Sequence, residues 1–510
     1  MTAAPVHNSP FQAVLDLADE AATNSLAESV SGALRPGDLV TLQGDLGSGK
    51  TTFARHLIRT LSGNAELEVP SPTFTLVQNY ETPRGHVVHA DLYRLGDPSE
   101  LAEIGWDEIG GEPIVLVEWP ERAGEELSHD RLALELKIAN SGQSRQAVLE
   151  GHGSWAARLK RLIDIGAFTM TAGWVRAERQ HIQGDASTRR YERLVLEDRT
   201  AVLMDAPRRP DGPPVRDGKP YSQIAHLAED VLPFAAMAEA LIEAGLSAPA
   251  IIASDLDRGL LLIEDFGTTP LLVDGAYTAE RITAAADALL HLHLLHRPDT
   301  LHFDRHVHHI PDYDLSALLI ETELLLDWYL PHHGRKADAK AREDFRALWS
   351  KVLIPITTGE RTWTLRDYHS PNLMWLPERD GVRRVGVLDF QDAVMGHPAY
   401  DVVSLLQDAR VDIAQELELG TLTHYVGARR AVRPDFDPAA FARAYAVLGA
   451  QRATKILGIF VRLSSRDGKN GYMKHLPRLR HYLRRNLLHP ALAELKAWYD
   501  ETMPELQEAR

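Results

Sequence analysis

The chain has 510 residues, of which 44% are hydrophobic and 25% are charged, as in ordinary globular proteins. These values exclude a disordered chain, a collagen and a disulfide scaffold, and the length predicts two or three domains with substantial cores. Cysteine is absent, which excludes disulfides, thiolate catalysis and iron–sulfur ligation.

The first residues lack the basic-then-apolar layout of a signal peptide. No apolar run approaches the roughly 20 residues that are needed to cross a bilayer. We therefore expect a soluble, cytoplasmic protein with no membrane partner.

Charge is unevenly distributed along the chain. The formal net charge is −17, and residues 1–150 hold 10 basic against 23 acidic side chains. Such a segment does not attract a polyanion, so we expect no direct nucleic acid binding through bulk charge. Residues 452–485 have the opposite bias, with ten Lys and Arg against one acid, Asp467. This basic stretch is either a solvated helical face or a wall that attracts an anionic ligand.

The first third of the chain alternates helical and strand patterns. Residues 11–34 have the apolar spacing of a helix and end in a turn signal. A short apolar strand is expected at 39–43, an amphipathic helix at 51–61 and a second buried strand at 114–119. This order predicts an α/β domain, a parallel sheet flanked by helices.

The pattern changes after this block. An amphipathic helix over 154–165 leads out of it, strand-like segments follow at 191–196 and 201–206, and the chain becomes mostly helical after about residue 275. We predict a first domain at 1–153, a linker helix at 154–170 and a second domain at 171–510. The second domain would divide into lobes at about 171–270 and 271–510.

A phosphate-binding pattern lies between the first strand and the following helix. Gly44 to Thr51 fits G-x-x-x-x-G-K-[ST]. Its glycines let backbone N–H groups curl around phosphate oxygens, and the helix points its positive end at the same oxygens. The expected nucleotide-binding residues are Gly44, Gly47, Ser48, Gly49, Lys50, Thr51 and Thr52.

Carboxylates at the ends of later strands complete this predicted site. Glu118 closes the second buried strand, and it is either a metal-linked, water-orienting group or a solvated strand terminus. Asp91 ends another short apolar stretch and could face the same metal. Together with the Thr51 hydroxyl, these groups predict a Mg²⁺–nucleotide site.

The segments GDLGSGKTT, SPTF, HADLYR and VEWP follow one another within about residues 10–150. In this order they resemble the TsaE family, P-loop ATPases of the bacterial machinery that makes threonylcarbamoyladenosine in transfer RNA. The resemblance implies ATP hydrolysis coupled to the partner proteins TsaB and TsaD. It also implies functional roles for Lys50, Thr51, Asp91 and Glu118. A nucleotide-gated binding module, rather than an enzyme, is the alternative.

A second constellation has the spacing of a kinase catalytic loop. Asp367 is followed five residues later by Asn372, as in H-R-D-x-x-x-x-N, although Leu365 stands where that pattern has histidine. The spacing lets the aspartate receive a substrate hydroxyl proton while the asparagine binds Mg²⁺. Asp389 ends a strand 22 positions later, where kinase-like folds place a metal-binding aspartate. An α+β bilobal, protein-kinase-like domain is therefore predicted.

The expected nucleotide groups of this second domain lie before that loop. The DFG sequence at 265–267 precedes the catalytic loop, so we interpret it as the connection between lobes, where Glu264 and Phe266 could meet the adenine. Gly184 and Ser187 lie where a phosphate-covering loop is expected.

The strand expected to carry a phosphate-pairing lysine has none, since Met204 and Asp205 occupy that region. Arg189 or Arg190 is a candidate substitute for the missing charge.

Several segments of residues 170–500 together resemble the AmgK family of aminoglycoside-phosphotransferase-like kinases. These are GDASTRRY, VLMDAP, LLIEDFG, LRDYHSPNLMWLPE, VGVLDFQDAVMGHPAYD and SLLQDARVD. The resemblance implies ATP-dependent phosphorylation of the anomeric hydroxyl of N-acetylmuramate and N-acetylglucosamine in cell-wall recycling. It makes Asp367 the catalytic base, Asn372 and Asp389 metal ligands, and Asp401 a structural brace.

Another small alcohol, such as an amino alcohol or an aminoglycoside, is the alternative substrate. An aminoglycoside is a polycation and would need an acidic wall, whereas the basic stretch at 452–485 suits the carboxylate of N-acetylmuramate. The sequence thus predicts a bifunctional protein that uses ATP and Mg²⁺ at two separate sites.

Overall fold

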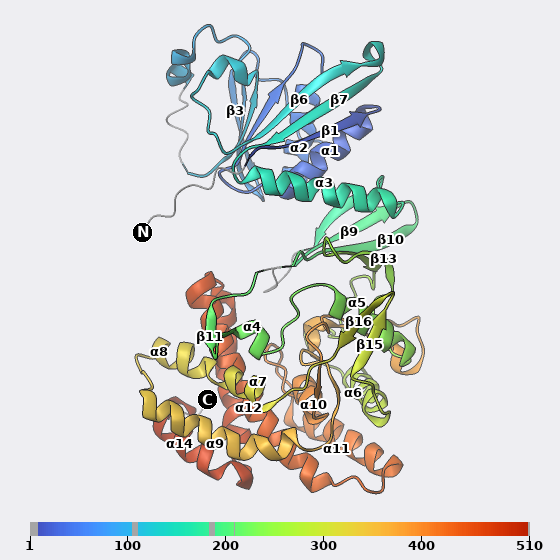
Figure 1. Ribbon diagram of the computed structural model, residues 1–510, viewed down its shortest axis with the longest axis vertical. Helices are drawn as coiled ribbons and strands as arrows, with labels where there is room; N and C mark the ends of the chain where they lie inside the picture. The colour runs from blue at the N-terminus through green and yellow to red at the C-terminus, as the bar shows by residue number, and fades with distance from the viewer. Residues whose placement is uncertain (1–8, 105–110, 183–188, 209, 508–510) are drawn as a thin grey trace. The chain divides into compact units, whose positions relative to one another are not determined.

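A computed structural model describes residues 9–104, 111–182, 189–208 and 210–507. The chain forms two compact units (Figure 1). Unit 1 comprises Met1–Ile182 and Glu192–Thr200, and unit 2 comprises Gln183–Tyr191 and Ala201–Arg510.

Unit 1 is built on a seven-stranded sheet with strand order β1-β7-β6-β2-β5-β4-β3. The inner strands β6, β2, β5 and β4 run parallel, which confirms the predicted parallel sheet, whereas β1, β7 and β3 pair antiparallel at the two edges. The strand bounds are β1 Phe11–Leu17, β2 Leu39–Gln43, β3 Val77–Thr82, β4 Gly85–Asp91, β5 Ile114–Glu118, β6 Leu132–Ala139 and β7 Ser144–Gly151.

The helix expected over residues 11–34 is wrong in its first part. Residues Phe11–Leu17 form the edge strand β1, and the helix α1 spans only Glu20–Ala33. The side chain of Asp19 caps α1 by accepting the Ala22 N–H at 2.8 Å, which fixes where the helix begins. Apolar residues at three- and four-residue spacing run through both elements, so periodicity alone missed this break.

Two longer helices complete the core of unit 1. Helix α2, Lys50–Ser62, begins directly after the glycine-rich turn. Helix α3, Trp155–Thr171, coincides with the predicted linker helix and buries Trp155 and Leu159 completely, next to β1 and β7. Shorter elements are η1 Pro98–Ile104, η3 Pro120–Ala123, η4 Asn140–Gly142 and the strand β8 Glu178–Ile182. Strand β9, Arg190–Leu196, belongs to unit 1 from Glu192 onward.

Unit 2 begins with antiparallel strands. Strand β10, Arg199–Asp205, pairs with β14, Leu260–Glu264, which in turn pairs with β13, Ile251–Asp255. Helix α5, Leu232–Glu243, contacts β13. The remaining strands form small pairs: β11 Pro214–Arg216 with β12 Lys219–Pro220, β15 Thr300–Phe303 with β16 His306–His309, β17 Thr362–Thr364 with β20 Val394–Gly396, and β18 Leu373–Trp375 with β19 Val385–Val387.

The rest of unit 2 is mostly helical, as predicted for the chain after about residue 275 (Figure 1). The helices are α4 Tyr221–Ile224, α6 Ala279–Leu294, α7 Leu315–Thr322, α8 Leu330–His332, α9 Ala339–Thr357, α10 Ala399–Leu406, α11 Gln415–Val432, α12 Pro438–Asp467, α13 Leu476–Asn486 and α14 Ala493–Thr502. Single turns are η5 Leu325–Tyr329, η6 Ser370–Asn372, η7 Gly381–Arg384, η8 Asn470–His475, η9 Pro490–Leu492 and η10 Pro504–Leu506. Within the described ranges, no helix is both long and apolar enough to span a bilayer.

Helix α12 is the central support of this helical region. Most of its residues between Phe441 and Leu463 are buried, because it contacts α10, α13 and η5. At Gly458 the helix approaches a neighbouring backbone so closely that a Cβ atom would lie 2.4 Å from the Leu324 carbonyl. A glycine in the middle of a helix costs stability, and here it permits close packing.

We predict opposite effects for two glycine-to-alanine changes in unit 2. Gly458→Ala forces α12 away from Leu324 and should lower the free energy of unfolding by about 1–3 kcal/mol. Gly427→Ala, on α11, meets nothing within 4 Å and should raise it by about 0.5–1 kcal/mol. Urea unfolding of the full chain measures both changes, and equal effects would contradict the packing argument.

Candidate active sites

The glycine-rich turn of unit 1 has a conformation that only glycine tolerates. Gly44 has a φ of 138°, and a Cβ atom there would lie 2.3 Å from the Leu136 carbonyl oxygen. Gly49 caps α2 with a φ of 110°. The turn is therefore tight and ends at the positive N-terminus of α2. This is the arrangement that binds phosphate.

Lys50 lies inside this turn. Its Nζ donates to the carbonyl oxygens of Gly44 at 2.7 Å and Asp45 at 3.0 Å, and it lies 3.9 Å from the centroid of the Trp119 ring. Burial lowers the pKa of Lys50, while the nearby Glu118 carboxylate opposes that shift. The ammonium group is thus held at the phosphate cradle by backbone oxygens and an aromatic face.

The predicted carboxylates come together beside the turn. Thr51 donates its hydroxyl to Glu118 Oε2 at 3.0 Å, and His89 Nε2 lies 3.0 Å from Glu118 Oε1. Glu118 is only 1% exposed, and Asp91 is its register partner on the neighbouring strand β4. The structure therefore brings Asp91 and Glu118 next to Lys50 and Thr51, although the carboxylates lie 40 or more positions away in the sequence.

Asp91 joins two of the motif segments. It accepts the Thr73 hydroxyl at 2.6 Å and the Tyr93 backbone N–H at 2.9 Å. Thr73 and His89 lie within the SPTF and HADLYR motifs, but neither residue was predicted to have a role. Both residues could have been predicted from the sequence, because each lies inside a recognisable motif.

Arg145 was missed altogether. From the start of β7 it donates to the backbone oxygens of Ser48 at 3.0 Å and Gly47 at 3.1 Å. A guanidinium that holds these carbonyls fixes the orientation of the peptide groups that form the phosphate cradle. No local pattern marks an arginine that acts from 97 positions away.

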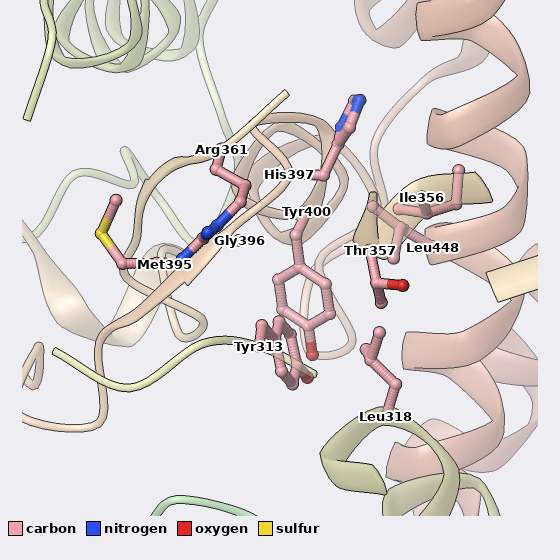
Figure 2. A pocket seen from close by; sticks show the side chains of 10 residues that line it. All are labelled: Tyr313, Leu318, Ile356, Thr357, Arg361, Met395, Gly396, His397, Tyr400 and Leu448. Carbon is pink, nitrogen blue, oxygen red and sulfur yellow. The ribbon is translucent and has the colours of Figure 1, made fainter. Parts of the chain in front are cut away.

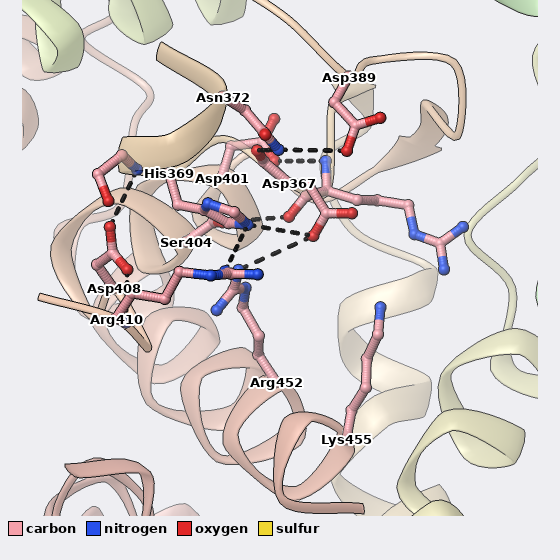
Figure 3. Close-up of polar contacts among 12 residues, drawn as sticks. Asp367, His369, Asn372, Asp389, Asp401, Ser404, Asp408, Arg410, Arg452 and Lys455 are labelled. Atoms are coloured by element: carbon pink, nitrogen blue, oxygen red, sulfur yellow. Dashed lines mark hydrogen bonds and ion pairs between the residues drawn. The ribbon is translucent and has the colours of Figure 1, made fainter. Parts of the chain in front are cut away.

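In unit 2, a buried carboxylate braces the catalytic loop (Figure 3). Asp401 accepts the backbone N–H groups of Leu365 at 2.6 Å and Arg366 at 2.9 Å, which is the structural role expected for it. Burial raises the pKa of Asp401 to about 7. Arg366 has a left-handed backbone, with a φ of 66°, and its guanidinium pairs with the buried Glu321.

Asp367 follows directly and remains accessible, with 41% of its side chain exposed. Desolvation by itself would raise the pKa of Asp367. The electrostatic effect of His369, Lys455 and Arg452 is stronger and lowers the pKa to about 2. The carboxylate is therefore ionised at any physiological pH and can accept a hydroxyl proton.

Asn372 and Asp389 lie beside Asp367, as predicted. Asn372 Nδ2 donates to the Asp367 carbonyl oxygen at 2.9 Å and to Asp389 Oδ2 at 3.4 Å. Arg189 NH1 lies 3.3 Å from Asp389 Oδ1, so a cation lies beside the predicted metal-binding aspartate. Burial, followed by the charge of Asp367, raises the pKa of Asp389. A divalent cation would relieve this crowding of carboxylates.

The predicted adenine region follows β14. The Glu264 side chain pairs with Arg379, and Phe266 packs so tightly that a Cβ atom on Gly386 would lie 2.7 Å from its ring. The DFG segment follows β14 and precedes the catalytic loop, and within it Asp265 Oδ1 accepts the Gly267 backbone N–H at 2.9 Å. Gly184 and Ser187 lie outside the described residues.

A small cavity lies next to the brace of the catalytic loop (Figure 2). Its volume is about 10 Å³, close to that of a single water and far below that of a nucleotide. Its lining residues are Tyr313, Leu318, Ile356, Thr357, Arg361, Met395, Gly396, His397, Tyr400 and Leu448. It is therefore not a substrate site.

Two family models match the chain. The model of threonylcarbamoyl adenosine biosynthesis protein TsaE matches residues 17–147, and the model of the phosphotransferase enzyme family matches residues 178–438. The second match covers about half of the chain.

Curated relatives match the same two parts. An N-acetylmuramate/N-acetylglucosamine kinase of Caulobacter vibrioides is 40% identical over 350 residues, 66% of this chain and 95% of that protein. Its namesake in Pseudomonas aeruginosa is 34% identical over 319 residues, 61% of this chain and 84% of that protein. The tRNA threonylcarbamoyladenosine biosynthesis protein TsaE of Rickettsia typhi is 36% identical over 127 residues, 25% of this chain and 88% of that protein.

The chain thus joins a P-loop nucleotide-binding fold to a kinase-like phosphotransferase fold, which confirms both predicted fold classes. It belongs to the phosphotransferase enzyme family and, through its N-terminal part, to the TsaE family.

We predict that Arg145→Gln weakens nucleotide binding in unit 1, because the phosphate cradle loses the cation that holds two of its carbonyls. The KM for ATP should rise about tenfold. It is measured from the rate of ATP hydrolysis at several ATP concentrations, without a phosphoryl acceptor. Arg35→Gln is the matched control, because this exposed arginine lies before β2, at the end of the strand away from the turn. An unchanged KM in Arg145→Gln would contradict the assignment.

Proposed function

We propose that the protein is bifunctional. Unit 2 transfers the γ-phosphoryl group of ATP to the anomeric hydroxyl of N-acetylmuramate and N-acetylglucosamine, for cell-wall recycling in the cytoplasm. The TsaE part hydrolyses ATP within the machinery for threonylcarbamoyladenosine in transfer RNA. The convergence of Asp367, Asn372 and Asp389 in one site supports the kinase assignment most strongly, together with 40% identity to a kinase of this name.

In the kinase reaction, Asp367 orients the sugar hydroxyl and accepts its proton as the oxygen–phosphorus bond forms and the bond to ADP breaks. Its pKa of about 2 makes it a weak base, so orientation and charge placement contribute more than proton abstraction. Asn372 and Asp389 would hold Mg²⁺, which supplies charge neutralisation for the phosphates. Arg189, beside Asp389, adds a further positive charge.

The nucleotide would extend from this site toward the lobe connection. The backbone near Glu264 and Phe266 remains the proposed adenine contact, and Gly184 and Ser187 the proposed phosphate cover. The cations near Asp367, including Arg452 and Lys455 of the basic stretch, disfavour a polycationic aminoglycoside as the acceptor.

In the P-loop part, the backbone of the turn and Lys50 would bind the phosphates, and Thr51 would hold Mg²⁺ with Asp91 and Glu118 nearby. Both oxygens of Glu118 already accept or face protein donors, which suits a water-orienting role rather than direct metal ligation. The partners proposed for this activity are TsaB and TsaD, and the acidic charge of the segment favours protein partners over direct contact with RNA.

We predict that the two activities can be removed separately. Asp367→Asn should lower the kcat of sugar phosphorylation by about 10²–10⁴-fold, because the hydroxyl loses the carboxylate that orients it and accepts its proton, and leave sugar-independent ATP hydrolysis intact. Lys50→Ala should do the reverse. Phosphate release and anomeric-phosphate detection on both variants test this, and near-normal sugar turnover in Asp367→Asn would overturn the kinase site.

ATP hydrolysis by the P-loop part should depend on its partners. We expect the full-length Asp367→Asn variant to hydrolyse ATP faster when TsaB and TsaD are added, whereas the double variant Asp367→Asn/Lys50→Ala should not respond. If the partners bind without any change in turnover, this part is a nucleotide-gated binding module and not an ATPase.

A further inference from the structure

The basic stretch at 452–485 is divided between two helices with different surroundings. On α12, Arg452 and Lys455 are buried and lie within ion-pair distance of Asp367 and Glu321. On α13, the basic side chains line a separate cavity of about 340 Å³, which the loop between α10 and α11 completes. Its polar lining consists of Asp412, Gln415, His481 and three arginines, Arg478, Arg484 and Arg485. None of these residues belongs to either proposed nucleotide site.

Two of the three arginines already have an acidic partner. Arg478 donates through Nε and NH2 to the two carboxylate oxygens of Asp412, at 2.6 and 2.7 Å. Arg485 NH2 donates to Oε1 of the buried Glu418 at 2.5 Å. These two pairs are neutral as units, so neither supplies surplus charge to the cavity.

Arg484 supplies a positive charge that no acid balances. It is half-buried in the cavity wall, and among the residues that the structure describes it makes no hydrogen bond or ion pair. A recess lined by an excess of one charge concentrates the electric field and attracts ions of the opposite sign. The cavity therefore favours an anion.

The other two arginines are fixed before a ligand binds. Arg478 NH1 donates to the Ala409 carbonyl oxygen at 3.0 Å, and 14% of the Arg478 side chain is exposed. The guanidinium of Arg485 lies 5.4 Å from the centroid of the Tyr482 ring, which is itself buried. Side chains that are already held in place lose little conformational entropy when a ligand binds. The wall is thus preorganised, unlike a row of solvated arginines on a helix.

The chemistry of the wall suits a phosphate group. Guanidinium groups bind phosphate through paired, charge-assisted hydrogen bonds. A phosphate monoester carries about −1.5 to −2 charges at neutral pH. It can therefore bind Arg484 and also compete for Arg478, because the present partner Asp412 is 71% exposed and exposed ion pairs are weak. The volume of about 340 Å³ leaves room for an organic group beside the phosphate.

We propose that this cavity binds the phosphate group of a small phosphorylated metabolite. The site goes beyond the proposed function, because neither the kinase reaction nor ATP hydrolysis in the P-loop part requires it. Free inorganic phosphate and a sugar phosphate share the chemistry that the cavity recognises, and the experiment distinguishes these two sources.

The test measures binding to the full chain by isothermal titration calorimetry at constant ionic strength. The probes are inorganic phosphate and glucose 6-phosphate. Arg484→Gln should weaken binding about tenfold or more, because a charge-assisted interaction is lost, and Arg484→Lys should recover part of the loss. Arg430→Gln, at an exposed position of α11, is the matched control for charge and should bind as the unmodified protein does.

A second variant should change affinity in the opposite direction. Asp412→Asn removes the negative charge from the cavity and releases Arg478, so it should tighten phosphate binding severalfold. Tighter binding of glucose 6-phosphate than of inorganic phosphate would assign the organic group to the cavity, and equal binding would assign free phosphate.

Sugar phosphorylation and ATP hydrolysis should be unchanged in Arg484→Gln, which reports that the variant is folded. Unchanged affinity in Arg484→Gln, an equal loss in Arg430→Gln, or no binding of either probe at millimolar concentration would overturn the proposal. A loss of both catalytic activities in Arg484→Gln would do so too. Because neither probe is ATP or the proposed acceptor, a failure of the proposed function would leave this result interpretable.

Discussion

The catalytic loop of unit 2 depends on one buried carboxylate, that of Asp401. By accepting two consecutive backbone N–H groups, it holds Leu365 and Arg366 in place and lets Arg366 adopt a left-handed backbone. Such a conformation is costly for a residue with a side chain unless its surroundings enforce it. The backbone turn at Arg366 leaves the side chain of Asp367 accessible in the site.

The guanidinium of Arg366 extends this support into the helical region. It pairs with Glu321, which also accepts from Tyr313 and Gln451 and faces Lys455. A buried acid with this many donors keeps its charge, since each donor compensates part of the lost hydration. The catalytic loop, α7 and α12 are thereby joined through one side chain, so the position of α12 and that of the loop are linked.

Sequence patterns predicted the parts of both sites that lie within single motifs. The glycine-rich turn, and the spacing of Asp367, Asn372 and Asp389, are local features, and the structure brings these residues together as expected. The residues that were missed act across long separations: Arg145 on the turn, Glu321 on Arg366, and Arg410 on His369. An isolated arginine or glutamate has no local signature, because its partner is set by the tertiary fold. The edge strand β1 was missed for a different reason, since its apolar spacing also fits a helix.

The position of Lys50 sets a condition on which ligands the turn can bind. Its ammonium already has two carbonyl oxygens and an aromatic ring as partners. A nucleotide that binds here must place a charged phosphate close enough to Lys50 to replace these partners. A nucleoside monophosphate has no outer phosphate to do so, and the turn should therefore favour ligands that carry two or three phosphates.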